Sequence, residues 1–129
     1  MANYSFGISY ATFENLKSQG LDIITNKDLR LDLVTLYEEN FWLLKDMENK
    51  MANTLTNATI PFTRKHFRVM EGGNYKPNDY NELLKNEELL NLLYESNFLA
   101  QTYFDASIQA IEATSKVIEK IDNELKDRL

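Results

Sequence analysis

Apolar residues recur at steps of three and four along a stretch that starts near residue 26, which is the spacing of one face of an α-helix. The series runs to about residue 58 through Leu29, Leu33, Leu36 or Tyr37, Asn40, Leu44, Met47, Met51, Leu55 and Ala58. Asn26 precedes the series and suits an N-cap. Asp28 follows in the first turn, where its negative charge interacts favourably with the helix dipole. The pattern predicts a long amphipathic helix over about residues 26–58.

A second apolar series predicts a longer helix over about residues 87–127. It steps by three and four for five heptads through Leu90, Leu93, Asn97, Ala100, Phe104, Ser107 or Ile108, Ile111, Thr114, Ile118, Ile121 and Leu125. A repeat of seven residues favours left-handed bundle or coiled-coil packing. We expect this seam to pack against a neighbouring helix, with Ala100, Ser107 and Thr114 permitting a close approach.

The few Gly and Pro residues indicate where the chain turns. There are four Gly and two Pro, and four of these six lie between Pro61 and Pro77. They predict shorter helices near 9–19, 61–68 and 79–85, with a loop over 69–78 and with residues 1–8 a disordered or expression-derived start. Turn-rich β folds need many more such residues. The chain is therefore predicted to be a single all-α domain over 1–129, an antiparallel up-down bundle built on the two long helices.

The two long helices carry nearly the same hexapeptide. Residues 36–41 read Leu-Tyr-Glu-Glu-Asn-Phe and residues 93–98 read Leu-Tyr-Glu-Ser-Asn-Phe. A duplicated helical hairpin and chance convergence of helical sequences both explain this echo. Antiparallel packing with residue 58 beside residue 79 places the hexapeptides opposite each other, and Asn40 is then expected to lie beside Asn97.

Charge and composition exclude several functions. The net charge is −6 and the pI is about 4.8, which opposes general nucleic-acid binding and a basic helix on a membrane surface. The longest apolar run is Phe41 to Leu44, whereas a membrane span needs about 20 predominantly apolar residues. There is no signal-peptide pattern, and without Cys there are no disulfides or thiolate zinc sites. The chain as given is expected to be soluble.

No catalytic pattern occurs in the sequence. The single His66 has Thr63 rather than Glu three residues before it, so a di-iron bundle motif is absent, and we interpret it as a solvated loop residue. Neither a Gly-x-Ser-x-Gly elbow nor a phosphate-binding loop is present. The sequence predicts no enzyme activity, no catalytic residue, no metal site and no cofactor.

Two groups of residues are candidates for binding. Aromatic side chains gather in the middle of both long helices and predict either a ligand pocket or plain core and interface packing; they are Tyr37, Phe41, Trp42, Tyr94 and Phe98. The short basic run of Arg64, Lys65 and Arg68 predicts either an anion contact or a charged linker.

The order of segments resembles an uncharacterised family of Bacteroidota proteins. Its members have a Leu-Lys-Ser-x-Gly turn, here residues 16–20, then an Ile-x-Asn-x-x-Leu-Arg helix start, here residues 24–30, and then a Tyr, here Tyr37. They close on a Leu-rich segment and a long C-terminal helix, as in 83–125. Such proteins carry one N-terminal membrane span. The resemblance implies an extracytoplasmic region whose span is missing here, and it implies no activity.

The leading expectation is a non-enzymatic helical module for sensing, ligand binding or protein interaction. The resemblance implies that it is tethered to the inner membrane and faces the periplasm. The architecture of long helices predicts that small shifts between them pass a signal to the membrane end. The alternative is a cytosolic helical adaptor that only oligomerises, with no small-molecule ligand. We expect a homodimer, because a wide apolar face buries more surface when two copies pair. Binding of an unidentified protein partner or small ligand is a further possibility that the sequence leaves open.

Overall fold

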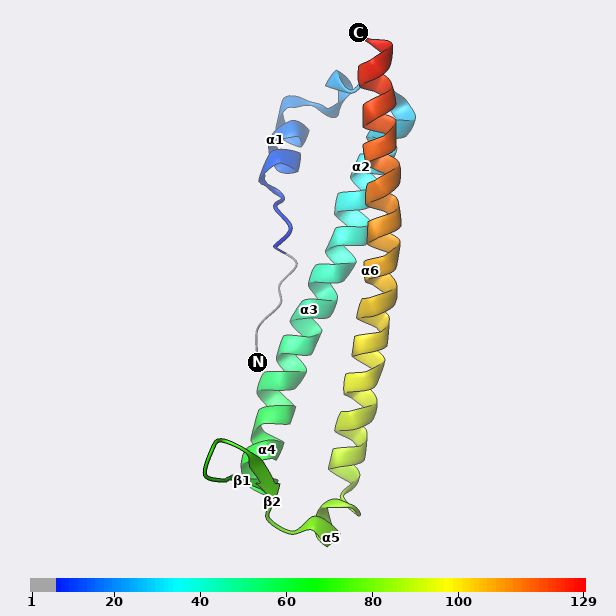
Figure 1. The fold of residues 1–129 in the computed structure, drawn as a ribbon. Coiled ribbons are helices and arrows are strands. Elements are labelled where there is room, and N and C mark those ends of the chain that lie inside the picture. Colours follow the sequence, from blue (N-terminus) through cyan, green and yellow to red (C-terminus); the bar gives the residue numbers. More distant parts are fainter. Residues whose placement is uncertain (1–6) are drawn as a thin grey trace. The chain divides into compact units, whose positions relative to one another are not determined.

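The computed structural model describes residues 7–129, and most of the predicted 1–8 start lies outside these residues. The described chain is mostly helical with one two-stranded sheet, so the all-α prediction is confirmed in its broad form (Figure 1). Its contacts divide it into two units. Unit 1 holds the described residues up to Asp46 together with Tyr103–Leu129, and unit 2 holds Met47–Thr102.

The helices of unit 1 begin and end at residues with clear local reasons. They are α1 (Ala11–Gln19), a 3₁₀ turn (Leu21–Ile23), α2 (Lys27–Thr35), a π-helical segment (Leu36–Phe41), the start of α3 (Trp42–Thr54) and the end of α6 (Glu87–Asp127). Gly20 terminates α1 with φ +97°, a value that side chains disfavour. The N-cap of α1 is Tyr10, whose side chain makes no capping bond.

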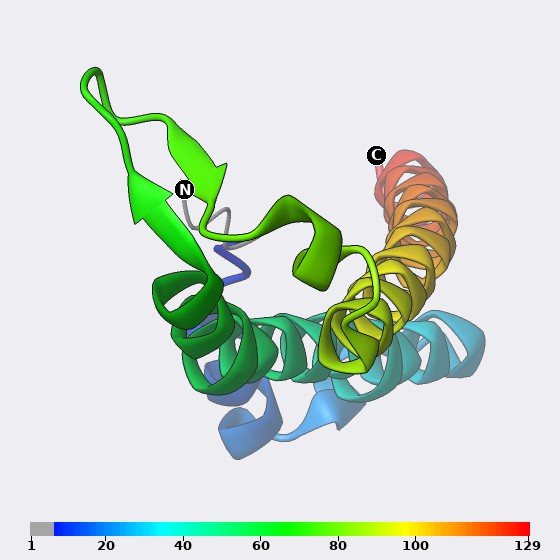
Figure 2. The ribbon, with the colours of Figure 1, turned by 90° about the horizontal axis from the view of Figure 1, so that it is seen from below.

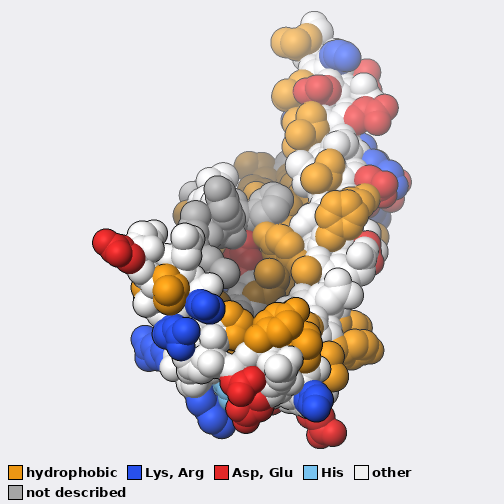
Figure 3. Space-filling view, turned by 60° about the horizontal axis from the view of Figure 1, so that its bottom comes forward, with side chains coloured by type: hydrophobic (Ala, Val, Ile, Leu, Met, Phe, Trp, Pro, Cys, Tyr) orange, Lys and Arg blue, Asp and Glu red, His pale blue; other side chains and the backbone are white. Residues whose placement is uncertain are grey.

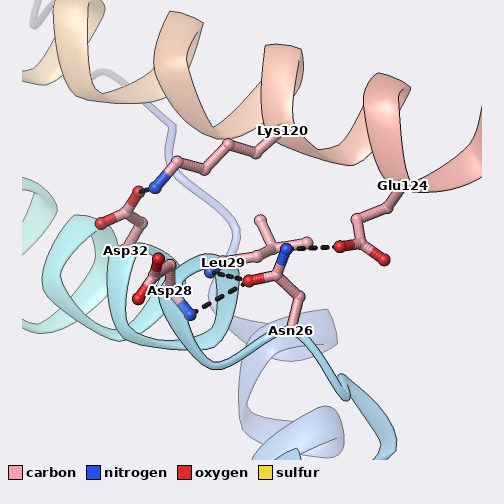
Figure 4. Close-up of polar contacts among 6 residues, drawn as sticks. All are labelled: Asn26, Asp28, Leu29, Asp32, Lys120 and Glu124. Carbon is pink, nitrogen blue, oxygen red and sulfur yellow. Dashed lines mark hydrogen bonds and ion pairs between the residues drawn. The ribbon is translucent and has the colours of Figure 1, made fainter.

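Asn26 caps α2, as predicted, and also connects it to α6. Its Oδ1 accepts hydrogen bonds from the backbone N–H groups of Asp28 and Leu29, both at 3.1 Å. Its Nδ2 donates to the Glu124 carboxylate, and Lys120, one turn before Glu124 on α6, pairs with Asp32 of α2 (Figure 4). The Asn26 side chain therefore caps the start of α2 and also helps to hold α2 against α6.

The core of unit 1 consists of two apolar clusters between α2–α3 and the C-terminal half of α6. Leu29 and Leu36 pack with Val117, whereas Leu44 packs with Ala106 and Ala110. Residue numbers rise on one side as they fall on the other, so the two segments of unit 1 run antiparallel.

This register differs from the predicted one. Asn40 lies beside Gln109 and Ala113, at a shallow hollow between the helices. The register that the sequence analysis used to place Asn40 beside Asn97 therefore does not describe the packing within unit 1.

The face of α6 that packs inside unit 1 is not the seam that the sequence predicts. Ala106, Ala110 and Val117 are buried, with 5%, 3% and 4% of their surfaces exposed. Most large side chains of the predicted seam in unit 1 are exposed, Ile111 by 58%, whereas Ile121 packs against the Leu29 cluster. The small residues that allow close packing lie on the other side of the helix, so the seam prediction was wrong about which face is covered.

Unit 2 contains the end of α3, a π-helical segment (Leu55–Thr59), α4 (Ile60–His66), β1 (Phe67–Val69), β2 (Tyr75–Pro77), α5 (Tyr80–Leu83) and the start of α6. Helical backbone continues through Pro61, which sits just after the π segment. The Ile60 N–H bonds to the Leu55 carbonyl five residues back. Widening the helix in this way accommodates a proline that lacks its own N–H.

The predicted loop over 69–78 is partly wrong, because a β-hairpin occupies much of it. β1 pairs antiparallel with β2, placing Arg68 opposite Lys76 and Val69 opposite Tyr75. Gly72 and Gly73 form the turn with φ +88° and +82°. The Gly residues correctly predicted a turn. The two strands are only three residues long, which is too short for the sequence to show a recognisable strand pattern.

The last two helices start at the predicted caps. Asp79 Oδ1 accepts from the Glu82 N–H at 2.9 Å, and Asn86 Oδ1 accepts from the Leu89 N–H at 3.0 Å. The helix near 79–85 is present as α5 and the helix near 61–68 as α4, which ends earlier because β1 begins at Phe67.

Truncating the most buried large side chain of unit 1 should destabilise it strongly. Leu44 is 1% exposed, so Leu44→Ala leaves a cavity and should lower the free energy of unfolding by about 3 kcal/mol. Leu31 is 64% exposed, and the control Leu31→Ala should change it by less than about 0.5 kcal/mol. Urea unfolding followed by circular dichroism measures both. Equal effects would contradict the core assignment.

Candidate functional site

Tyr37 is the centre of an aromatic cluster, defined here as Tyr10, Phe13, Tyr37 and Phe41, in unit 1. Its ring stacks on Phe13 with centroids 4.3 Å apart, and meets Tyr10 and Phe41 edge-on at 5.8 and 5.0 Å. Phe13 comes from α1, so the cluster holds α1 against the π-helical segment. Its first role is therefore packing.

Charged side chains surround this cluster. Lys17 Nζ donates to Glu38 at 2.7 Å and lies 3.8 Å from Glu14. The same ammonium lies 5.6 Å from the centre of the Phe13 ring, and Lys45 lies at 5.6 Å from the Tyr10 ring. These distances suit weak cation–π contacts at an exposed site.

The hydrogen bond to Glu38 raises the pKa of Lys17 above that of an ordinary lysine, because it favours the charged form. A lysine with a raised pKa contributes stability below its unfolded pKa and loses that contribution as the pH rises through its folded pKa. The Lys17 ammonium is therefore charged at neutral pH, and its contribution is lost as the pH rises through the raised pKa of Lys17.

A shallow hollow adjoins the cluster, with a volume of about 280 Å³. It is lined by Tyr10, Phe13, Glu14, Tyr37, Glu38, Trp42 and Lys45. Trp42 is 57% exposed. Sites for small ligands usually measure about 300–1,000 Å³ and enclose most of the ligand. The volume of the hollow lies just below this range.

The five aromatic residues predicted from sequence fall into two groups. Tyr37, Phe41 and Trp42 belong to unit 1, where the first two join the aromatic cluster and Trp42 lines the hollow. Tyr94 and Phe98 belong to unit 2 and are 76% and 60% exposed on α6. The sequence analysis missed Tyr10 and Phe13 as members of the site. Tyr10 and Phe13 lie three residues apart, which is the spacing of one helix face. This spacing was visible in the sequence, but it did not indicate that the face packs against Tyr37.

The predicted basic residues lie at the end of α4 and in the hairpin. Arg64 and Lys65 occupy the last turn of α4, and Arg68 lies in β1 opposite Lys76. All four side chains are exposed. Within residues 7–129 no carboxylate forms an ion pair with any of them.

His66 differs from the predicted solvated loop residue. It ends α4 and is half-buried, with its ring 4.4 Å from that of Phe62. Its Nε2 atom is buried and has no hydrogen-bond partner in the described part of the chain. The stacking of this histidine on a buried phenylalanine serves packing, and no ion pair found among the described residues includes it.

The described residues contain no group of three or more His, Asp or Glu placed to hold a metal ion. Among the helices within residues 7–129, none combines the length and apolar character needed to cross a bilayer. No protein-family model, curated protein or solved structure matches this chain.

Removing the acceptor of Lys17 should lower its pKa selectively. In Glu38→Gln the pKa of Lys17 should fall toward the ordinary lysine value of about 10.4, because a neutral amide no longer stabilises the ammonium. Lys120 supplies the control, because its hydrogen bond to Asp32 also raises its pKa. The pKa of Lys120 should stay raised in Glu38→Gln and should fall in Asp32→Asn. NMR titration of the lysine side chains measures both. A Lys17 pKa unchanged by Glu38→Gln would disprove this pairing.

Proposed function

We propose that this chain is a non-enzymatic helical interaction module that pairs with a second copy of itself along α6. The observation that carries the proposal is an exposed apolar row in unit 1, named here the exposed seam. It comprises Phe104, Ile108, Ile111, Ile118 and Leu125, which are 60%, 42%, 58%, 54% and 55% exposed. Within unit 1 no described residue covers this row.

The exposed seam and the buried face lie on opposite sides of α6. Successive helical residues are about 100° apart, so Ile111 and Ala113 are separated by about 200° around the axis. A helix from a second copy can therefore pack on the seam without displacing α2 and α3 from the buried face. This geometry supports pairing between intact folded chains.

The apolar area of the seam fits an interface. Five large side chains, each with about half of its surface exposed, present roughly 500 Å². That is near the upper range of the largest apolar patch on ordinary monomers, and stable interfaces bury roughly 800 Å² on each partner. The flanking side chains of the same helix supply the remaining area.

The spacing of the seam favours an identical partner in parallel orientation. Phe104, Ile111, Ile118 and Leu125 are seven residues apart, with Ile108, Ser115 and Asp122 between them. In a parallel in-register pair each layer joins a residue to its own copy, which gives five wholly apolar layers, one Ser115 layer and one Asp122 layer near the end of the helix. An antiparallel pair mixes the two sets and places Asp122 or Ser115 against an apolar residue. A self-complementary pair also closes as a symmetric dimer.

Charges beside the seam favour the same orientation. One flank is uncharged at Ser107, Thr114 and Ile121, and the other is acidic at Asp105, Glu112 and Glu119. Parallel coiled coils place one flank against the opposite flank of the partner. Antiparallel pairing brings acidic flanks together, which is unfavourable.

The up-down bundle, the membrane tether and ligand binding also form part of this proposal. The antiparallel packing within unit 1 supports an up-down bundle built on two long helices. Tethering at the periplasmic face of the inner membrane rests on the family resemblance alone, and a gene that encodes no apolar span before residue 4 would remove it. The small hollow beside Trp42 gives ligand binding weaker support than the exposed seam gives to pairing.

Charged substitutions on the seam should separate the pair. Light scattering coupled to gel filtration should give twice the 15.1 kDa chain mass for the natural sequence and the chain mass for Ile111→Lys with Ile118→Lys. Leu31→Lys places the same charge on an exposed leucine of α2 and should remain dimeric. Unchanged circular dichroism checks folding. The pairing would be refuted if the natural chain were monomeric at a protein concentration of about 100 μM, which is about 100 times a micromolar Kd. A double variant that remains dimeric would refute it as well.

The absence of native Cys makes orientation directly testable. Ser115→Cys should form an interchain disulfide under mild oxidation, because a parallel in-register pair brings this position close to its copy. Asn123→Cys, exposed on α6 outside the seam, should cross-link far less. Non-reducing electrophoresis measures both. A dimer in which Ser115→Cys does not cross-link would exclude the parallel register while leaving the pairing itself intact.

A further inference from the structure

Positive charge is concentrated in one short segment of this acidic protein. Residues 60–78 carry Arg64, Lys65, Arg68 and Lys76 against the single acid Glu71. The rest of the chain has ten Lys and Arg against nineteen Asp and Glu. The segment corresponds to α4 and the β-hairpin of unit 2, so the fold places the four cations around one structural feature. Figure 3 shows Lys and Arg side chains gathered there, next to apolar side chains.

The hairpin itself has one apolar and one basic face. Side chains alternate along a strand, and directly paired residues share a face. Val69 and Tyr75 are paired and are both 64% exposed, and Arg68 and Lys76 are paired on the other face. Met70, at the turn, is 42% exposed. Seen from below, the hairpin projects away from α4 (Figure 2).

We propose that this hairpin binds the surface of a bilayer that contains anionic lipids. The hairpin enters the headgroup region by its turn end, so that Val69, Met70 and Tyr75 insert on one face while the basic side chains on the other face and at the end of α4 contact lipid phosphates around it. Binding of this kind needs apolar insertion together with basic residues near the surface. The hairpin supplies both, and its cations have no carboxylate partners to displace within residues 7–129.

The exposed apolar residues favour a bilayer over other anionic partners. A free phosphate ion gains nothing from Val69 and Tyr75, whereas headgroups and the upper acyl chains accommodate both kinds of side chain. Tyr75 has the amphipathic ring that occurs often at membrane interfaces. The acidic remainder of the chain is repelled by the same surface, which restricts binding to the hairpin. This proposal does not depend on pairing through α6.

Vesicle flotation with the full chain tests the proposal. The protein should float with vesicles of phosphatidylcholine and phosphatidylglycerol at a ratio of about 3:1 in low salt and bind pure phosphatidylcholine weakly. Each surface cation contributes about fivefold to partitioning, so Arg68→Gln with Lys76→Gln should weaken binding about 25-fold. Val69→Ser with Tyr75→Ser should also weaken it, without changing the net charge.

A matched control separates local from overall charge. Lys116→Gln with Lys126→Gln makes the same change in net charge at two exposed lysines of α6 and should leave binding nearly unchanged. Circular dichroism checks that each variant folds. Absence of flotation with the anionic vesicles, an equal loss in the control, or full binding by the serine variant would overturn the proposal. Competition by 10 mM inorganic phosphate beyond that of sodium chloride at equal ionic strength would indicate a phosphate site instead.

Discussion

Helix α6 has apolar residues on two opposite faces in unit 1, and the described chain covers only one of them. Ala106, Ala110 and Val117 face α2 and α3, where small side chains let the helices approach closely. The larger residues, such as Ile111 and Ile118, remain exposed. Close packing inside the unit and apolar exposure outside it are therefore two results of one distribution of side-chain size around a single helix.

The contact that uses small residues also needs something to fix its register. A smooth face of Ala and Leu tolerates sliding by a turn better than interlocking large side chains do. The Lys120–Asp32 and Asn26–Glu124 contacts match only one alignment of α2 with α6. Exposed pairs of this kind contribute little net stability. Their greater effect is to specify which turn of α6 packs against α2.

The repeated hexapeptide shows how far local sequence determines local structure. Residues 36–41 form a π-helical segment, whereas residues 93–98 lie in regular α-helix. Five of the six residues are identical. The difference follows from what surrounds each copy, because Tyr37 and Phe41 pack in the aromatic cluster with Tyr10 and Phe13, whereas Tyr94 and Phe98 are exposed. Both copies are helical, as their periodicity indicates, but packing decides the hydrogen-bond pattern.

Features that depend on neighbouring residues could be predicted from the sequence, and features that depend on distant ones could not. The caps at Asn26, Asp79 and Asn86 and the bounds of α6 follow from local chemistry. The buried face of α6 could not be chosen, because both faces have helical spacing and the sequence analysis gave priority to the larger residues. The same limit applied to the candidate site, where Tyr37 was found but its partner Phe13 was not. A stripe of large apolar residues on a helix therefore predicts a contact, and only the chain's own packing decides whether that contact lies within one molecule or between two.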